Sequence, residues 1–299
     1  MKKTILAFVL AAVACGAHAQ LMYKVSGNGL EKPSYVVGTY RLAPQAMGQL
    51  ITGMAEALNA TDQVYGEINT DYFTADNSQA AKTAGSMQNG KTIQQLLSAS
   101  ELARFNAFLM KTQGQDLRNR VLAAKVENRT PGALAKDMAQ WLYLANNRGI
   151  FDPMSQVDSY FIRLAKKNNM PVYGLETVDE YIKATFQSGS EARQKERMMC
   201  LIDHQDFYQQ KMSNILNGYM SQNMSAIETA VADRLGGSCD ATPEETAELN
   251  ARIAAWAQKM PDIMSKTPTL FTIDVQHMVG EQGLLQLLRN AGYEVEAMK

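Results

Sequence analysis

The feature that most constrains the fold is the position of the strand-like segments, which lie at the two ends of the chain. Near the start, residues 21–26 and 34–40 are apolar, rich in tyrosine and valine, and flank a turn-rich stretch. At the end, residues 269–275 and 293–298 flank a short helical pattern over 284–292. Short runs of β-branched and aromatic residues bounded by turn residues are typical of strands. We therefore expect the N- and C-terminal thirds of the chain to share one sheet.

The middle of the chain is predicted to be largely helical, with two further strands over 62–69 and 170–175. Capping boxes, in which Ser or Thr precedes Glu by three residues, mark helix starts at Ser98, Thr177 and Thr242. Helices are expected over about 46–59, 101–111, 132–144, 157–168 and 242–260, with two more between 190 and 235. The predicted fold class is α/β, in one domain.

Composition and charge narrow the class of protein. The chain has 299 residues, of which 46% are hydrophobic and 20% charged, so it can bury a substantial core without a structural metal. The formal net charge is -1, and no Lys/Arg-rich tail is present. These features argue against a nucleic-acid partner.

The first residues have the pattern of a secretory signal rather than of a fold. Lys2 and Lys3 precede an apolar run from Ile5 to Ala14, and Ala17-His18-Ala19 follows as an A-x-A cleavage site. The apolar run is too short to span a bilayer. We expect residues 1–19 to be a signal peptide and residues 20–299 to form the exported, bacterial-type domain.

Cys15 leaves a second route open, in which the exported chain is anchored as a lipoprotein. The preceding residues 12–14 match the leucine-led motif of such processing poorly, so we favour soluble export to the periplasm or the medium. No other stretch of the sequence is apolar enough to predict a transmembrane helix.

Export changes the interpretation of the two remaining cysteines, Cys200 and Cys239. In an oxidising compartment two cysteines most simply form a disulfide, and this one would stabilise the fold by about 4 kcal/mol in the chain-entropy model. The alternative is a catalytic Cys200 with His204 as its base, since residues four apart share a helix face. We favour the disulfide.

Several segments together resemble the TraB/GumN family, which includes the Tiki proteins. "YVVGTYRLAP" is similar to that family's Gly-x-x-His strand end, and "VYGEIN" to its strand ending in Glu-x-Asp. "VDSYFIRLAKKNNMPVYGLETVDE" resembles its Asp-helix-strand-Gly-Leu-Glu-Thr segment. "FTIDVQHMVGEQGLLQLLRNAGYEVEAM" resembles its second histidine strand and terminal helix-strand unit. The resemblance covers nearly all of the chain after the signal.

The resemblance implies an α/β domain in which two histidine loops and a glutamate converge. Tiki-like members are regarded as metal-dependent peptidases that use these groups to hold the ion and activate water. By position, Glu67 matches the glutamate, His277 the second histidine and Arg252 the arginine of an Arg-Asn pair. The Glu176 of "GLET" is expected to be structural, satisfying backbone donors at a helix start.

The chain departs from the family pattern where the site would lie. Arg41 stands in place of the first histidine, Asp274 in place of a glycine, Asn69 in place of an aspartate and Ile253 in place of the asparagine after the arginine. Arginine does not ligate metals, and we expect Arg41 to pair with Glu67. A metal site could survive with Asp274 standing in as a ligand beside the glutamate and the histidine.

Two functions are the main candidates. The first is a remodelled, non-catalytic or functionally shifted cleft, without a cofactor, that binds an acidic or peptide ligand. Arg41 and Arg252 would face that cleft, with Tyr40 and Asn69 beside them. The second is a metal-dependent peptidase or hydrolase that uses Glu67 and His277 catalytically with a Mn, Co or Zn ion. A scaffold without a ligand is a third possibility.

Overall fold

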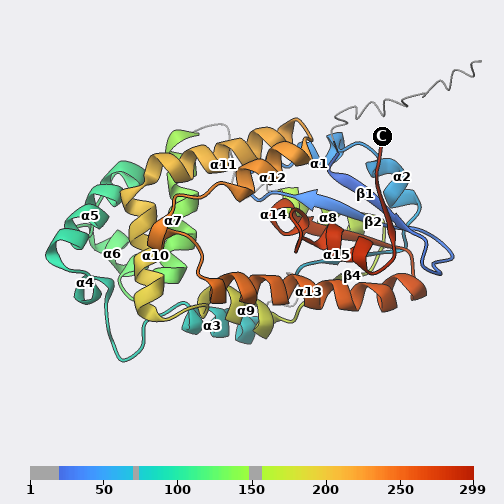
Figure 1. The fold of residues 1–299 in the computed structure, drawn as a ribbon. Helices are drawn as coiled ribbons and strands as arrows, with labels where there is room; N and C mark the ends of the chain where they lie inside the picture. The colour runs from blue at the N-terminus through green and yellow to red at the C-terminus, as the bar shows by residue number, and fades with distance from the viewer. Residues whose placement is uncertain (1–19, 70–73, 148–156) are drawn as a thin grey trace, which may run out of the picture.

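The structure, a computed structural model, describes residues 20–69, 74–147 and 157–299. It contains a six-stranded sheet with the strand order β4-β3-β5-β2-β1-β6. The strands are β1 (Met22–Ser26), β2 (Ser34–Thr39), β3 (Gln63–Gly66), β4 (Val172–Gly174), β5 (Thr269–Asp274) and β6 (Glu294–Ala297). In Figure 1 the sheet, with β1, β2 and β4 labelled, lies on one side of the molecule and the helices α4–α7 (residues 93–146) and α10 (Glu191–Asp203) lie on the other. The terminal strands share one sheet, which confirms the expected α/β fold. The predicted signal peptide and Cys15 lie outside the described residues.

The strand directions bring three loops together. β2 and β3 both pair with β5 in parallel, and Thr39 at the end of β2 lies opposite Asp274 at the end of β5. The carboxyl ends of parallel strands meet at one edge of a sheet, where α/β proteins commonly bind ligands. The segments that follow these strands carry Arg41, Glu67 and His277. β1 and β6 complete the sheet as antiparallel strands on the other side of β2.

Helices make up most of the rest of the described chain. Capping boxes form at Ser98, Thr177 and Thr242, as the sequence predicts. The helices are α1 (Met47–Leu50), α2 (Met54–Asn59), α3 (Ala75–Ala84), α4 (Ile93–Leu96), α5 (Ala99–Gln113), α6 (Arg120–Val126), α7 (Pro131–Asn146), α8 (Val157–Lys167), α9 (Val178–Phe186), α10 (Glu191–Asp203), α11 (Gln205–Met220), α12 (Met224–Ala232), η2 (Gly237–Cys239), α13 (Pro243–Lys266), α14 (Val275–Met278) and α15 (Leu284–Asn290).

Two expected helices are divided in the structure. The helix predicted over 46–59 is two short helices, because Gly53 adopts a left-handed conformation with φ 81°. The region 190–235 holds three helices instead of two. His204 interrupts the first pair with a non-helical backbone, and Asn223 caps the third with its side chain. His204 therefore ends α10 and does not lie within a continuous helix with Cys200.

Two element ends also differ from expectation. α13 continues through Pro261 to Lys266, although a proline usually ends a helix. β3 ends at Gly66, so Glu67 and Asn69 belong to the following loop and not to the strand.

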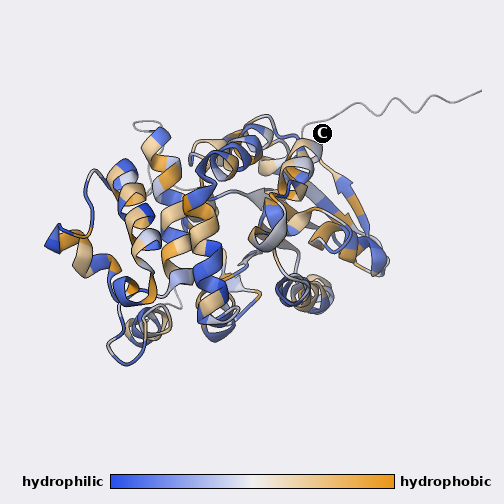
Figure 2. Ribbon diagram, turned by 60° about the vertical axis from the view of Figure 1, so that its left-hand side comes forward, coloured by the Kyte–Doolittle hydropathy of each residue, from blue (hydrophilic) through white to orange (hydrophobic). Residues whose placement is uncertain are grey.

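The helices form layers around the sheet. Side chains alternate between the two faces of the sheet along β2. Tyr35 and Val37 belong to one hydrophobic core, which also includes residues of α1, α2, α8, α11 and α12. Val36 belongs to a second core with residues of α13 and α15. A third core holds α5, α6, α7 and α10 together away from the sheet. Figure 1 shows α11 and α13 extending from the sheet to this helical layer. In Figure 2 many helices carry hydrophobic residues on one side and hydrophilic residues on the other.

The predicted disulfide is present in the structure. Cys200 of α10 is bonded to Cys239 of η2, with a Cα–Cα distance of 5.6 Å. Beside it, the guanidinium of Arg193 donates to the backbone carbonyls of Ser238 and Asp240 and to the carboxylate of Glu245. The segment between α12 and α13 is therefore fastened to α10 both covalently and by hydrogen bonds. In the part of the chain that the structure describes, every helix is too short or too polar to span a bilayer.

Candidate functional site

Glu67 and His277 meet at the carboxyl edge of the sheet. Glu67 Oε1 lies 2.7 Å from His277 Nδ1 and also accepts a hydrogen bond from the backbone N–H of Asp274 at 2.9 Å. Glu67 follows β3, Asp274 ends β5 and His277 lies in α14. A single carboxylate oxygen of Glu67 therefore joins the ends of β3 and β5. The side chains of Glu67 and His277 are 19% and 18% exposed.

The electrostatics of this pair favour its charged form. Burial lowers the pKa of His277, but the adjacent carboxylate of Glu67 outweighs it and leaves the pKa raised. Burial likewise raises the pKa of Glu67, but His277 and the hydrogen bonds to the carboxylate leave it lowered. Each partner therefore stabilises the charge of the other.

Asp274, the predicted third metal ligand, has another role in the structure. Its carboxylate caps α14 by accepting from the backbone N–H of Gln276 at 2.9 Å. Burial and the neighbouring Glu67 raise its pKa, although His277 acts in the opposite direction. Across residues 20–69, 74–147 and 157–299, no three His, Cys, Asp or Glu side chains lie close enough to hold a metal ion. His277 Nδ1 and Glu67 Oε1 are hydrogen-bonded to each other, so these two atoms are engaged within the protein.

Arg41 does not pair with Glu67, and this expectation was wrong. The side chain of Arg41 is exposed and forms no ion pair with a described residue. The physical reason is that the oxygen of Glu67 is already engaged by His277 and Asp274. The positive charge of Arg41 contributes to lowering the pKa of Tyr181 of α9.

Arg252 lies near the site, but its charge is balanced. Its Nε and Nη2 donate to Glu176 Oε2 and Oε1 at 2.9 and 2.6 Å. Its guanidinium also lies 4.8 Å from the ring centroid of Trp256, whose ring is 5.3 Å from that of His277. Among the described residues, the carboxylate of Glu176 pairs with this arginine and not with the backbone donors of a helix start that the sequence led us to expect. A chain of contacts thus connects Glu176, through Arg252 and Trp256, to His277.

Tyr40 and Asn69 are buried and hydrogen-bonded to neighbouring backbone. Tyr40 is 2% exposed, lies against Tyr219 and donates to the backbone carbonyl of Met212 at 3.3 Å. The amide of Asn69 donates to the carbonyl of Val172 at 2.9 Å and so joins the end of β3 to β4. The binding roles predicted for both residues remain predictions.

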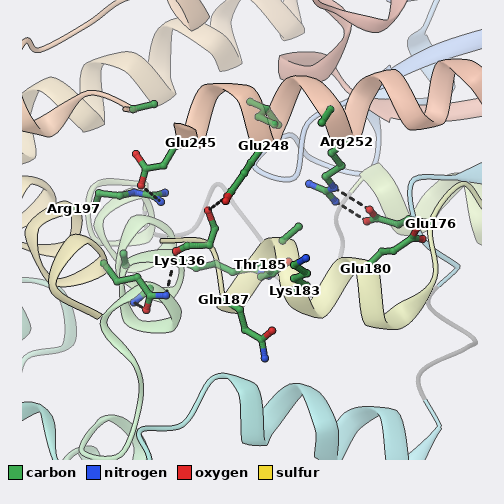
Figure 3. Close-up of a pocket in the computed structure, with 18 of the residues that line it drawn as sticks. Lys136, Glu176, Glu180, Lys183, Thr185, Gln187, Arg197, Glu245, Glu248 and Arg252 are labelled. Carbon is green, nitrogen blue, oxygen red and sulfur yellow. Dashed lines mark hydrogen bonds and ion pairs between the residues drawn. The ribbon is translucent and has the colours of Figure 1, made fainter. Parts of the chain in front are cut away.

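A cavity of about 850 Å³ adjoins this chain of contacts. We call it the α9–α13 cavity, since these helices and parts of α7 and α10 form its walls (Figure 3). Figure 3 shows Glu245, Glu248 and Arg252 on α13, with Arg252 directed toward Glu176. The small apolar residues of its wall include Ala135, Ala139, Ala184, Ala251 and Ala255.

Sequence reasoning did not identify Lys136 and Trp256, which line this cavity, or Tyr181, which contacts Lys136. Trp256 carried a signal, because it lies one helical turn after Arg252 on the same helix face. Lys136 of α7 and Tyr181 of α9 are 2.9 Å apart between Nζ and Oη, but they are far apart in sequence and match no motif. Only the packing of α7 against α9 brings them together.

Comparison with known proteins agrees with the sequence resemblance. The family model described as the TraB/PrgY/gumN family matches residues 21–297, which is nearly the whole chain. A search of curated proteins and a search of solved structures each found no match. All six strands of the sheet lie within the matched residues. On this match, the chain belongs to the TraB/PrgY/gumN family.

Proposed function

We propose that this protein is an exported member of its family that binds an acidic or peptide ligand without hydrolysing it and without a cofactor. The observation that carries the proposal is the double engagement of Glu67 Oε1 by His277 Nδ1 and the amide of Asp274. A metal-dependent hydrolase would need these side chains for the ion and for water. Here Glu67 Oε1 and His277 Nδ1 hydrogen-bond each other and join the loop after β3 to α14.

The binding part of the proposal rests on the α9–α13 cavity and on Arg41. The cavity is within the size range of sites for small ligands. Arg41 is exposed and has no acidic partner among the described residues, so its guanidinium is available for a two-point contact with a carboxylate. Its charge contributes to lowering the pKa of Tyr181 of α9, although Arg41 is not among the residues that line the cavity.

Export is supported by the signal-like residues 1–19 and by the disulfide. Disulfides persist mainly in oxidising compartments such as the periplasm or the medium. We propose the soluble route over lipid attachment at Cys15.

The test incubates the purified protein with a library of acidic and neutral peptides, with and without Mn²⁺, Co²⁺ and Zn²⁺. Binding is measured by affinity selection and cleavage by mass spectrometry. We expect acidic peptides to be retained uncut, and Arg41→Ala to weaken retention at least about fivefold, as for loss of a charge-assisted hydrogen bond. Unchanged retention by Arg41→Ala, or cleavage of the peptides, would contradict the proposal.

A metal-dependent peptidase is the second candidate, and one observation favours it. The other oxygen of Glu67 has no partner among the described residues, and the Glu67 and His277 side chains remain about a fifth exposed. Calorimetric titration with Mn²⁺, Co²⁺ and Zn²⁺ separates the two functions. Binding by the wild type that Glu67→Ala abolishes would favour the peptidase. A silent wild type beside an Arg41→His variant that binds would mean that Arg41 closes an inherited metal site.

A further inference from the structure

A half-buried lysine in the α9–α13 cavity has no carboxylate partner among the described residues. Lys136 of α7 lines the cavity, and its Nζ donates one hydrogen bond, to Tyr181 Oη at 2.9 Å. The same Nζ lies 5.2 and 5.4 Å from the ring centroids of Tyr181 and Phe186. An ammonium group has three N–H donors, so two of them have no partner among the described residues.

The other cations of the cavity differ from Lys136. Three of them have carboxylates within 4 Å: Arg252 with Glu176, Arg197 with Glu245 and Lys259 with Glu180. Lys183 has no such partner in the part of the chain that the structure describes, but its side chain is exposed to solvent. Lys136 is thus a half-buried cation that a ligand can balance. Such a charge gains more from an anion than a solvated one does.

The surroundings of Lys136 indicate what the rest of the ligand would be. The cavity wall carries alanines from three helices, Ala135 and Ala139 on α7, Ala184 on α9, and Ala251 and Ala255 on α13. Glu248, whose carboxylate accepts from Ser188 Oγ at 2.8 Å, adds an exposed negative charge on α13. The cavity therefore carries charges of both signs. The binding free energy of an anion would come from direct contact with Lys136 and not from a positive potential throughout the cavity.

We propose that Lys136 binds the carboxylate of an organic acid whose apolar body lies against the alanine wall of the α9–α13 cavity. The inference rests on the proposed function and specifies the acidic ligand. Tyr181 is a positioning residue, because its oxygen fixes the ammonium at the cavity. The charge of Lys136 acts back on the phenol: burial raises the pKa of Tyr181, but Lys136 and Arg41 leave it lowered.

The test uses octanoate and its uncharged analogue octanamide, which share an apolar body and differ in charge. Calorimetry measures the Kd of both probes for the purified protein. We expect the wild type to prefer octanoate at least about tenfold, as for a charge-assisted hydrogen bond. Lys136→Met should remove this preference while octanamide binding changes little. Tyr181→Phe should reduce it, because the ammonium loses the acceptor that orients it.

Lys183→Met is the matched control, since it removes an exposed cation of the same cavity, and it should keep the preference. The proposal is overturned if the wild type binds neither probe, if Lys136→Met keeps the preference, or if Lys183→Met loses it equally. Thermal melts confirm that each variant is folded. Peptide binding that depends on Arg41 but not on Lys136 would overturn this inference and leave the proposed function standing.

Discussion

Arg252 and Glu176 form a two-point ion pair, with Nη2 and Nε of the arginine 2.6 and 2.9 Å from the two carboxylate oxygens. The Glu176 side chain is 3% exposed and that of Arg252 is 21% exposed. Because of this pair, the arginine expected to attract an acidic ligand is already neutralised within the protein. The pair also fixes α13 to the segment that follows β4.

Arg252→Met is expected to destabilise the fold by about 3 kcal/mol, because it leaves a buried carboxylate without its partner. Thermal denaturation should show a Tm lower by about 5–10 °C. Adding Glu176→Gln to this variant should restore part of the loss, since the uncompensated charge is gone. A double variant no more stable than Arg252→Met would show that the charge of Glu176 is not the cause.

The pair of Glu67 and His277 predicts a pH dependence of stability. The folded-state pKa of His277 is raised above its ordinary value of 6.5, so its contribution is complete below about 6.5 and is lost as the pH rises through the folded-state value. The pKa of Glu67 is lowered from 4.5, so its contribution is present above about 4.5 and is lost as the pH falls through the lower value. Asp274 and Arg252 also act on His277, raising and lowering its pKa respectively.

His277→Gln should therefore cost more stability near pH 5.5 than near pH 8.5. Urea unfolding of the wild type and the variant at both pH values measures this difference. An equal cost at the two values would mean that the neutral hydrogen bond, and not the charge on the imidazole, holds Glu67.

The disulfide between Cys200 and Cys239 spans 39 residues of sequence and is expected to contribute about 4 kcal/mol in the chain-entropy model. Reduction should lower the Tm by several degrees. A Cys200→Ser/Cys239→Ser variant should melt at the lowered temperature with or without reductant, which separates loss of the bond from other effects of the reagent. Equal melting temperatures for the oxidised and reduced protein would contradict the prediction.

Gly38 in β2 allows α14 to lie close to the strand. A Cβ at this position would come within 2.6 Å of Val275 Cγ1 and 3.3 Å of Met278 Sδ. Gly38→Ala should destabilise the protein by about 1–3 kcal/mol through overpacking. Val275→Ala in the same chain should recover part of this, because it removes the nearer atom. Chemical denaturation of the two single variants and the double variant tests the contact, and additive costs would disprove it.

The sheet and the helix starts could be predicted from the sequence because they depend on local patterns. The apolar segments over 21–26 and 269–275 and the capping boxes at Thr177 and Thr242 carry their own signals. The partners of Glu67 could not be predicted. Which polar groups bind Glu67 depends on the geometry of the loops. In the structure its Oε1 is bound by the amide of Asp274 and the ring of His277.

The end of α13 and the cavity also depend on packing between distant segments, so the sequence did not predict them. Pro261 usually ends a helix, but α13 continues through it as the helix packs on the sheet with Met260 and Met264. Lys136 and Tyr181 approach each other only when α7 packs against α9, so no local pattern marks them.

The parallel pairing of β2 with β5 joins residues more than 200 positions apart in the sequence. Until the last quarter of the chain is available, β2 has a free hydrogen-bonding edge, and exposed edges of this kind favour aggregation. Folding dominated by such distant contacts is slow, because the ends must meet before the sheet can close. During synthesis from the N-terminus, the edge that carries Glu67 and His277 can therefore be completed only after β5 has been made. Late assembly of this edge is a property of the topology.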